Sequence, residues 1–383
     1  MTLPNQNPKR VLFIAPTPPP WAGPEIVSQT LLDNDVLQRS FEICHLRTTL
    51  HSSNRDKGKI TLGGMLKLFR MWLTAAKKIL FWRPTLIYTT LSQNGTGWFR
   101  DASFIWLAHV TCRPIVLHFH GGDFQCFYRR QNILMQRFVR ATLTRVAGVI
   151  VLANRLQEQF DGIVDPSRVH VLYNGVALPG QTEARSSSCP GIHVLYIGSL
   201  SVSKGVDTLL ETAYRLAKRD SKIRFTLAGE PIPNERNITH RPDGTALRTY
   251  DFTASSQHPS IRITPPVSGS EKTALYLESD VLVLDSYSEG LPMAVLEAMS
   301  QGLAMVVSPV GALPEILQEG ENALFVRPGS TTDLEAALVR LAHDPVMRQK
   351  MGENNRTLIV EKFSAEKLAA GLAAIFQQTL AMV

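Results

Sequence analysis

Short runs of valine, isoleucine and leucine recur along the chain, and longer stretches with a helical composition separate them. Most of these runs lack the apolar and polar alternation of a half-exposed strand, which is typical of strands buried on both faces of a parallel sheet. The strand and helix order repeats in both halves and predicts an α/β protein with two doubly wound, Rossmann-like parallel sheets. The predicted strands are Val11–Ala15, Thr85–Thr89, Ile115–His118, Val149–Leu152, Val169–Leu172, Val194–Ile197, Arg224–Leu227, Ile261–Thr264, Val281–Leu284 and Ala304–Val307.

The length of the chain favours two domains, because 383 residues of which 44% are hydrophobic can build two separate cores. The stretch from Pro179 to Gly191 is polar and lacks apolar periodicity, so we expect the break there. This places an N-terminal domain at 1–180, a linker at 181–190 and a C-terminal domain at 191–364. A helix at about 365–383 is expected to pack back onto the N-terminal domain.

Cysteine usage and hydropathy limit the cellular setting. Cys44, Cys112, Cys126 and Cys189 are scattered without a CxxC pair, so we expect neither a disulfide framework nor a zinc site, and a reducing compartment is predicted. The first apolar run, Val11–Ala15, is too short for a signal peptide or a membrane span. No run of about 18 apolar residues occurs elsewhere, which excludes an integral helical membrane protein. We therefore expect a cytoplasmic protein.

Positive charge is concentrated in the first half. Residues 1–180 hold 21 Lys and Arg against 10 Asp and Glu, whereas residues 181–383 hold 19 against 23. Such a basic half suits an anionic partner, and nothing in the sequence resembles a nucleic-acid-binding module. Anionic lipid or a lipid-phosphate acceptor is therefore the favoured partner, and nucleic acid is not.

The segment Leu66–Arg83 contains five basic residues, two tryptophans and no acid. A basic amphipathic helix of this kind can lie on an anionic bilayer, at the inner face of the plasma membrane. The alternative is a helix that packs ahead of the strand Thr85–Thr89 and keeps its lysines in water.

The densest candidate site follows the predicted strand Val281–Leu284. A short loop carries Glu289 and Gly290, and a helix is expected to begin near Pro292, where the missing N–H of proline costs nothing. Backbone N–H groups from Gly290 onward would then face an anion at the carboxyl end of a buried strand, where open α/β sheets bind phosphate. The carboxylates of Glu289 and Glu297 could each hold a sugar or ribose diol, or be ordinary exposed acids.

The segment Ser286–Gly302 resembles the E-x7-E signature of the large family of retaining GT-B glycosyltransferases known as GT4, or glycosyl transferases group 1. The resemblance continues through Ser308–Ile316 and Glu319–Gly329 and extends over nearly the whole chain. It implies two facing Rossmann-like domains, a nucleotide-sugar donor in the C-terminal domain, an acceptor on the N-terminal domain, and retention without a metal. Glu289 would contact the donor hexose and Glu297 the nucleotide ribose.

A second candidate segment, Tyr196–Gly205, runs from a strand through a turn into a helix. Lys204 lies where a lysine could neutralise a departing pyrophosphate, which is the charge that the transfer step most needs to stabilise. The family carries an arginine five residues before this lysine, and this chain has Ser199 there. The donor-binding residues implied by the resemblance are Gly23, Gly198, Ser199, Lys204, Glu230, Glu289, Gly290, Leu291, Pro292 and Glu297.

In the N-terminal half, the stretch Pro16–Glu25 follows the first strand and places three consecutive prolines and Gly23 before a helix expected at Glu25–Leu32. It resembles the family's glycine-containing loop that faces donor phosphate and acceptor. It does not contain G-x-G-x-x-G, so a nicotinamide site is not supported.

The sequence His118-Phe-His-Gly-Gly-Asp123 ends another predicted strand. The resemblance identifies His120 as the histidine that contacts the transferred sugar, although a lone histidine is often only structural. It also implies an acceptor side formed by Trp21, Gly121, Asp123 and Asn174.

The predicted reaction is transfer of a hexosyl unit from a UDP- or GDP-sugar to a saccharide or lipid-linked saccharide in cell-surface polysaccharide synthesis. His120, Glu289 and Lys204 would carry it, with the nucleotide sugar as co-substrate and neither cofactor nor metal. Two alternatives remain: a nucleotide-sugar epimerase or hydrolase of the same fold, and a catalytically weak scaffold subunit, for which Ser199 is the hint.

Overall fold

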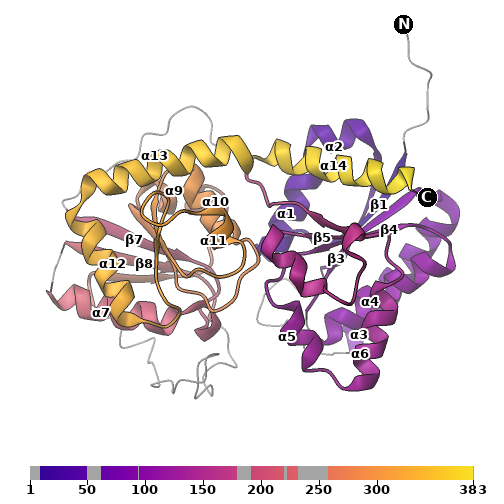
Figure 1. Ribbon diagram of the computed structural model, residues 1–383, viewed down its shortest axis with the longest axis horizontal. Coiled ribbons are helices and arrows are strands. Elements are labelled where there is room, and N and C mark those ends of the chain that lie inside the picture. Colours follow the sequence, from indigo (N-terminus) through magenta and orange to yellow (C-terminus); the bar gives the residue numbers. More distant parts are fainter. Residues whose placement is uncertain are drawn as a thin grey trace, which may run out of the picture. The chain divides into compact units, whose positions relative to one another are not determined.

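The computed structural model describes residues 9–49, 62–93, 95–178, 191–219, 222–231 and 258–382 (Figure 1). The chain forms two compact units. Unit 1 comprises Met1–Gly175 with Ala365–Val383, and unit 2 comprises Val176–Ser364. Unit 1 thus ends ahead of residue 180, the expected linker at 181–190 lies outside the described residues, and helix α14 (Ala365–Ala381) belongs to unit 1.

The sheet of unit 1 has six described strands, all parallel, in the order β2-β1-β3-β4-β5-β6. The chain begins in the middle of this sheet and reverses its direction of winding between β1 and β3. Crevices for ligands form at such a switch point, beyond the carboxyl ends of the strands. The strands are β1 (Arg10–Ala15), β2 (Glu42–Arg47), β3 (Leu86–Leu91), β4 (Ile115–Phe119), β5 (Gly148–Val151) and β6 (Val169–Val171).

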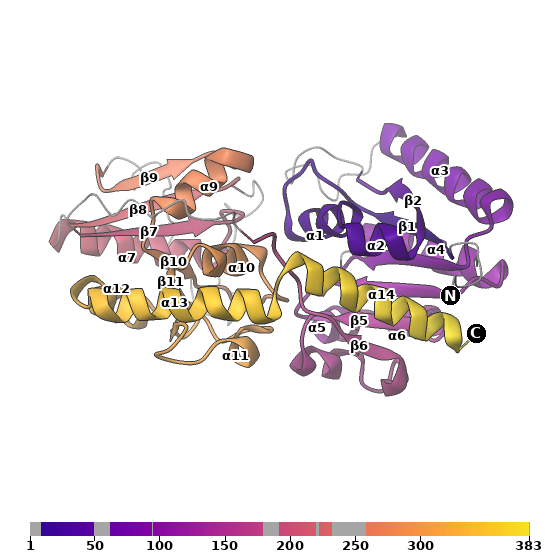
Figure 2. The same ribbon diagram turned by 90° about the horizontal axis from the view of Figure 1, so that it is seen from above.

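Helices cover both faces of this sheet. Helices α1, α2 and α14 lie on one face, and α3, α4, α5 and α6 lie on the other (Figures 1 and 2). Their bounds are α1 (Gly23–Leu32), α2 (Asp35–Ser40), α3 (Leu62–Lys77), the π-helix η2 (Lys78–Trp82), α4 (Gly95–Val110), α5 (Phe124–Arg129), α6 (Ile133–Leu143), and the 3-10 helices η3 (Asn154–Phe160) and η4 (Pro166–Arg168).

Aromatic side chains join α14 to the core of unit 1. Phe13 of β1 stacks on Tyr88 of β3 with ring centroids 4.1 Å apart. Phe376 of α14 packs edge-on against both Tyr88 and Phe41, at 5.8 and 5.5 Å. All four side chains are buried, so α14 supplies part of the interior of unit 1.

Unit 2 repeats the same architecture with the strand order β12-β11-β10-β7-β8-β9, again all parallel. Its switch point lies between β7 and β10. The strands are β7 (Ile192–Ile197), β8 (Ile223–Ala228), β9 (Ile261–Thr264), β10 (Val281–Leu284), β11 (Ala304–Val307) and β12 (Leu324–Phe325).

The helices of unit 2 also form two layers. Helices α7 and α12 lie on one face of the sheet, and α10 and α13 lie on the other, with α9 near α10 (Figure 1). Their bounds are the 3-10 helix η5 (Val202–Lys204), α7 (Val206–Arg219), α9 (Gly269–Leu277), α10 (Met293–Ser300), α11 (Leu313–Ile316), α12 (Thr331–His343) and α13 (Pro345–Lys362).

The predicted α/β fold and all ten predicted strands are confirmed, with shifts of a few residues at their ends. Two described strands were not predicted. Strand β2 is a sheet edge with polar residues and partial exposure, and β12 has only two residues. Neither shows the apolar run that marks a buried strand.

Two predicted helices have different bounds. The helix expected at Glu25–Leu32 already begins at Gly23. The segment Leu66–Arg83 is not one regular helix, because α3 gives way to the π-helix η2 at Lys78 and Arg83 ends it with φ 54°.

Candidate donor and acceptor sites

The signature loop of unit 2 follows β10 and leads into α10. Helix α10 begins at Met293, and Pro292 is its N-cap with φ −70° and ψ 127°, so the proline precedes the first helical turn instead of occupying it. Leu291 is buried, and Glu289 keeps 10% of its side chain exposed. The carboxylate of Glu289 therefore lies in a mostly enclosed setting, unlike that of an ordinary surface acid.

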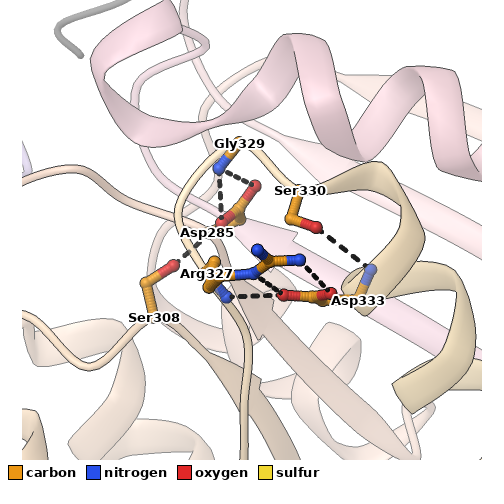
Figure 3. Close-up of polar contacts among 6 residues, drawn as sticks. All are labelled: Asp285, Ser308, Arg327, Gly329, Ser330 and Asp333. Carbon is orange, nitrogen blue, oxygen red and sulfur yellow. Dashed lines mark hydrogen bonds and ion pairs between the residues drawn. The ribbon is translucent and has the colours of Figure 1, made fainter.

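A buried carboxylate holds the base of this loop. Asp285 accepts hydrogen bonds from Ser308 Oγ at 2.8 Å and from the backbone N–H of Gly329, which lies 3.2 Å from both carboxylate oxygens (Figure 3). These partners follow β11 and β12, so Asp285 ties together the loops after three neighbouring strands. Asp285 directly precedes the signature segment Ser286–Gly302, but its partners are too distant in sequence to be predicted.

The loop after β12 has a second fixed contact. Arg327 donates from Nε and Nη2 to the two oxygens of Asp333, at 2.7 and 3.0 Å (Figure 3). The hydrogen bond from Arg327 is the main cause that lowers the pKa of Asp333 to about 2. Ser330 completes the arrangement by accepting from the Asp333 N–H and capping α12.

Two of the predicted charged residues of the donor site meet at the switch point of unit 2. Lys204, at the end of η5 after β7, lies 2.7 Å from Glu289 Oε1 after β10. The two loops also share a backbone hydrogen bond from Tyr287 N–H to the Ser203 carbonyl, at 3.1 Å. Because ligands of open α/β sheets bind beyond the strand ends at a switch point, this is the expected place for an anionic ligand.

Glycines permit the loops after β7 and β11 to approach the loop after β10 closely. Gly205 has φ 68°, and a Cβ there would lie 1.8 Å from the Asp285 carbonyl oxygen. Gly311 has φ 57°, and a Cβ there would lie 2.2 Å from the Glu289 carbonyl oxygen.

Gly290 accepts a hydrogen bond from Ala312 N–H through its carbonyl at 2.8 Å. Since a trans peptide places its C=O and N–H on opposite sides, the N–H of Leu291, in the same peptide unit, points away from Ala312.

Glu297, the second signature acid, is paired on α10. Lys272 Nζ lies 2.6 Å from each carboxylate oxygen, and Tyr276 Oη donates to Oε2 at 2.7 Å. Burial, and then the charge of Glu297, raise the pKa of Tyr276 well above its usual value. Sequence reasoning missed both partners, although Lys272 and Tyr276 share one face of α9 at a spacing of four residues.

The remaining predicted donor residues line the loops after β7 and β8. Gly198 donates to the Ala228 carbonyl at 3.1 Å, and Leu200 N–H donates to the Glu230 carbonyl at 2.9 Å, so the two loops run together. The Ser199 carbonyl accepts a hydrogen bond from Tyr196 Oη at 2.7 Å. Gly198, Ser199 and Glu230 are thus positioned beside one another, on the β8 side of Lys204.

In unit 1, His120 follows β4 and stacks on His118 with ring centroids 4.1 Å apart. His118 Nδ1 is 2.8 Å from Tyr88 Oη. Among the described residues, neither ring nitrogen of His120 has a hydrogen-bond partner, and both nitrogens are buried although the residue as a whole is partly exposed. Burial lowers the pKa of His120 to about 4, so its imidazole is neutral near pH 7.

The other predicted residues of unit 1 lie on loops. Trp21 is 57% exposed after β1, Gly23 is the first residue of α1, and Asn174 is buried after β6. Asp123 caps α5 by accepting from the Cys126 N–H at 3.3 Å, and its side chain is exposed. Gly121 faces Gln93, whose amide would lie 2.2 Å from a Cβ at that position.

The described residues hold no cluster of three or more His, Cys, Asp or Glu that could bind a metal ion. Within the same ranges, no helix combines the length and the apolar character needed to cross a bilayer.

Comparison with known protein families gives two matches that follow one another. The family described as Glycosyltransferase Family 4 matches residues 49–178, and the family described as Glycosyl transferases group 1 matches residues 190–358.

Among individual relatives, an MMP alpha-(1->4)-mannosyltransferase of Mycolicibacterium hassiacum is 31% identical over 231 residues, which are 58% of this chain and 51% of the relative. A GDP-mannose:cellobiosyl-diphosphopolyprenol alpha-mannosyltransferase of Xanthomonas campestris is 27% identical over 217 residues, 56% of this chain and 54% of the relative. The matched part thus spans about half the length of these relatives.

Among solved structures, Anabaena HepE in complex with UDP and glucose superposes with a TM-score of 0.69. It is 16% identical, with 96% of this chain and 99% of that chain covered. This likeness identifies the fold as GT-B.

Proposed function

Since the chain belongs to the family 4 glycosyltransferases of group 1, we propose that it is a retaining, metal-independent hexosyltransferase. Its donor is a UDP- or GDP-sugar held by unit 2, and its acceptor is a saccharide or lipid-linked saccharide presented by unit 1 in cell-surface polysaccharide synthesis. The names of two similar proteins support this range: one uses GDP-mannose and a diphosphopolyprenol-linked acceptor, and one is solved with UDP and glucose.

The ion pair of Lys204 and Glu289 is the observation that carries the proposal. It places a cation and a carboxylate 2.7 Å apart at the switch point of unit 2. A nucleotide-sugar donor there would present its diphosphate to the cation and its sugar hydroxyls to the carboxylate. When a donor binds, the ammonium of Lys204 turns to the diphosphate, and Glu289 becomes able to accept hydrogen bonds from sugar hydroxyls. The charge that develops on the leaving diphosphate then meets a lysine that is already in position.

Glu297 and His120 have separate roles in this proposal. Lys272 and Tyr276 hold the Glu297 carboxylate in one orientation, so that it can accept from the ribose hydroxyls without first losing rotamer freedom. His120 is neutral near pH 7 and therefore contributes a hydrogen bond to the transferred sugar instead of a charge.

The first experiment is a thermal-shift screen of the full chain against UDP, GDP, ADP and their sugars, with and without EDTA. A base that raises the unfolding midpoint identifies the nucleotide, because only a ligand of the folded state stabilises it. Glucose-type and mannose-type donors of that base are then incubated with acceptor, and release of nucleoside diphosphate is measured. Release of nucleoside diphosphate without any acceptor would favour the hydrolase, and conversion of the donor into an epimeric nucleotide sugar would favour the epimerase. No shift with any nucleotide at millimolar concentration would favour the scaffold, with Ser199 as the first position to change to arginine.

A further inference from the structure

Helix α3 exposes an apolar stripe along its length. Its members recur at the three- and four-residue spacing of one helix face and are at least 36% exposed: Met65, Leu66, Phe69, Trp72 and Leu73. The residues that pack inward are different ones, because Met71, Ala75 and Ile79 are buried. The exposed stripe is therefore additional to the face that anchors α3 to unit 1.

The π-helix η2 continues this exposed surface. Trp82 is held at the edge of the sheet, where its Nε1–H donates to Glu42 at 3.3 Å and the Arg10 guanidinium lies over its ring. The two preceding side chains point outward instead, with Leu80 56% exposed and Phe81 82% exposed. The extra residue of a π-turn allows an apolar pair to face solvent while its neighbours stay packed.

The charges in and around the stripe are mostly positive. Residues 62–157 contain thirteen Lys and Arg and only two acids, Asp101 and Asp123. Asp101 is paired with Arg100 at 2.7 Å, and Asp123 caps α5. Glu42, which accepts from Trp82, is paired with Arg10 at 3.0 Å, so the exposed charge near α3 and η2 is predominantly positive.

The basic side chains of α3 lie beside the apolar stripe. Lys67, Arg70 and Lys77 are exposed and follow the stripe along one side of α3. Lys78 does not take part, since its Nζ turns inward to Cys44 Sγ at 2.7 Å.

A second apolar and basic patch lies on the same face of unit 1. Helices α3, α4 and α6 cover one face of the sheet, with α3 at the edge beside β2 (Figures 1 and 2). At the start of α6, Ile133 and Leu134 are 67% and 72% exposed, and Arg137 and Arg140 are exposed on the same helix. The outer surface of this helix layer thus combines apolar side chains with arginine at two places.

We propose that this surface, formed by α3, η2 and the first turn of α6, docks unit 1 onto a bilayer rich in anionic lipid. Leu80, Phe81 and the other side chains of the α3 stripe enter the acyl boundary, whereas Trp72 lies at the headgroup level. Lys67, Arg70 and Lys77 contact anionic headgroups. The inference rests on the proposed function in one respect: a bilayer holds the lipid-linked acceptor, and docking would bring unit 1 to it.

The test is co-sedimentation of the full chain with vesicles of phosphatidylcholine alone, or of equal parts phosphatidylcholine and phosphatidylglycerol. We expect binding to the anionic vesicles to be at least about tenfold tighter and to weaken with added salt. The variant Leu80→Asp/Phe81→Asp should lower this binding by about tenfold or more. The control is Val346→Asp on α13 of unit 2, which is 75% exposed and should bind like the parent. Circular dichroism establishes that both variants are folded.

Three results would overturn the proposal. One is equal binding by the double variant and the control. Another is binding that does not depend on phosphatidylglycerol. The third is a concentration-dependent dimer in sedimentation that Leu80→Asp/Phe81→Asp dissociates, because the surface would then be covered by a second copy of the chain. Nucleotide thermal shifts of the same variants separate the two ideas: a chain that binds UDP or GDP but no vesicles leaves the proposed function intact.

Discussion

Replacing Lys204 by alanine should lower both stability and turnover, for different reasons. The substitution leaves Glu289, whose side chain is 10% exposed, without the cation 2.7 Å away, while the lysine side chain itself is 29% exposed. A surface ion pair contributes about 0–1 kcal/mol, and breaking a fully buried one costs about 3–5 kcal/mol. The intermediate exposure places the cost at about 2 kcal/mol, or about 4–8 °C in the unfolding midpoint of a unit of this size.

The catalytic loss should be larger and separable. Removing one preorganised group that stabilises developing charge costs about 100- to 1,000-fold in kcat. Adding Glu289→Gln to Lys204→Ala removes the unpaired charge, so the double variant should recover most of the lost stability while turnover stays low.

Scanning fluorimetry and nucleoside diphosphate release measure the two effects, with Lys218→Ala on the exposed end of α7 as control. If Lys204→Ala keeps the parental midpoint and turnover, both the pairing and the assigned donor site are wrong. If the double variant recovers turnover together with stability, the lysine acts only as a structural partner of Glu289.

Further predictions concern single positions, each measured by urea unfolding. Gly205→Ala should destabilise unit 2 by more than about 2 kcal/mol, since its Cβ meets backbone, whereas Gly269→Ala, with φ 55° and open space, should cost about 1 kcal/mol; equal costs would contradict the close packing. Asp285→Ala should cost about 2–3 kcal/mol by leaving the buried Ser308 hydroxyl and the part-buried Gly329 N–H without their acceptor, and a neutral effect would argue against these hydrogen bonds. The pKa of His120 is about 4 in the folded protein, against an ordinary value of 6.5, so its contribution to the free energy of unfolding is complete above pH 6.5. That contribution is lost as the pH falls towards 4, by about 2 kcal/mol between pH 7 and 5. His120→Asn should remove that part of the pH dependence, and an unchanged profile would refute it.

The sequence predicted the parts of the fold that depend on local pattern. Buried parallel strands such as Val281–Leu284 are continuous apolar runs, and they were found with small errors at their ends. The edge strand Glu42–Arg47 was missed because one side meets solvent, which permits polar residues and removes the signal.

Contacts between distant segments could not be predicted in the same way. Lys204 and Glu289 were each identified as site residues, but their pairing depends on β7 and β10 being neighbours in the sheet. The hydrogen bond between Gly329 and Asp285 and the ion pair between Lys272 and Glu297 likewise join segments from different βα units. Side-chain contacts of this kind follow from strand order and register, which periodicity does not specify.

The position of α14 also sets an order of assembly during synthesis. Phe376 fills the space against Phe41 and Tyr88, yet the ribosome adds it only after all of unit 2. Until then the apolar side chains of Phe41 and Tyr88 lack their partner on α14. Unit 1 therefore emerges first but can complete its core only after the whole of unit 2 has been synthesised, and the surface that waits for α14 is where a nascent chain would need a chaperone.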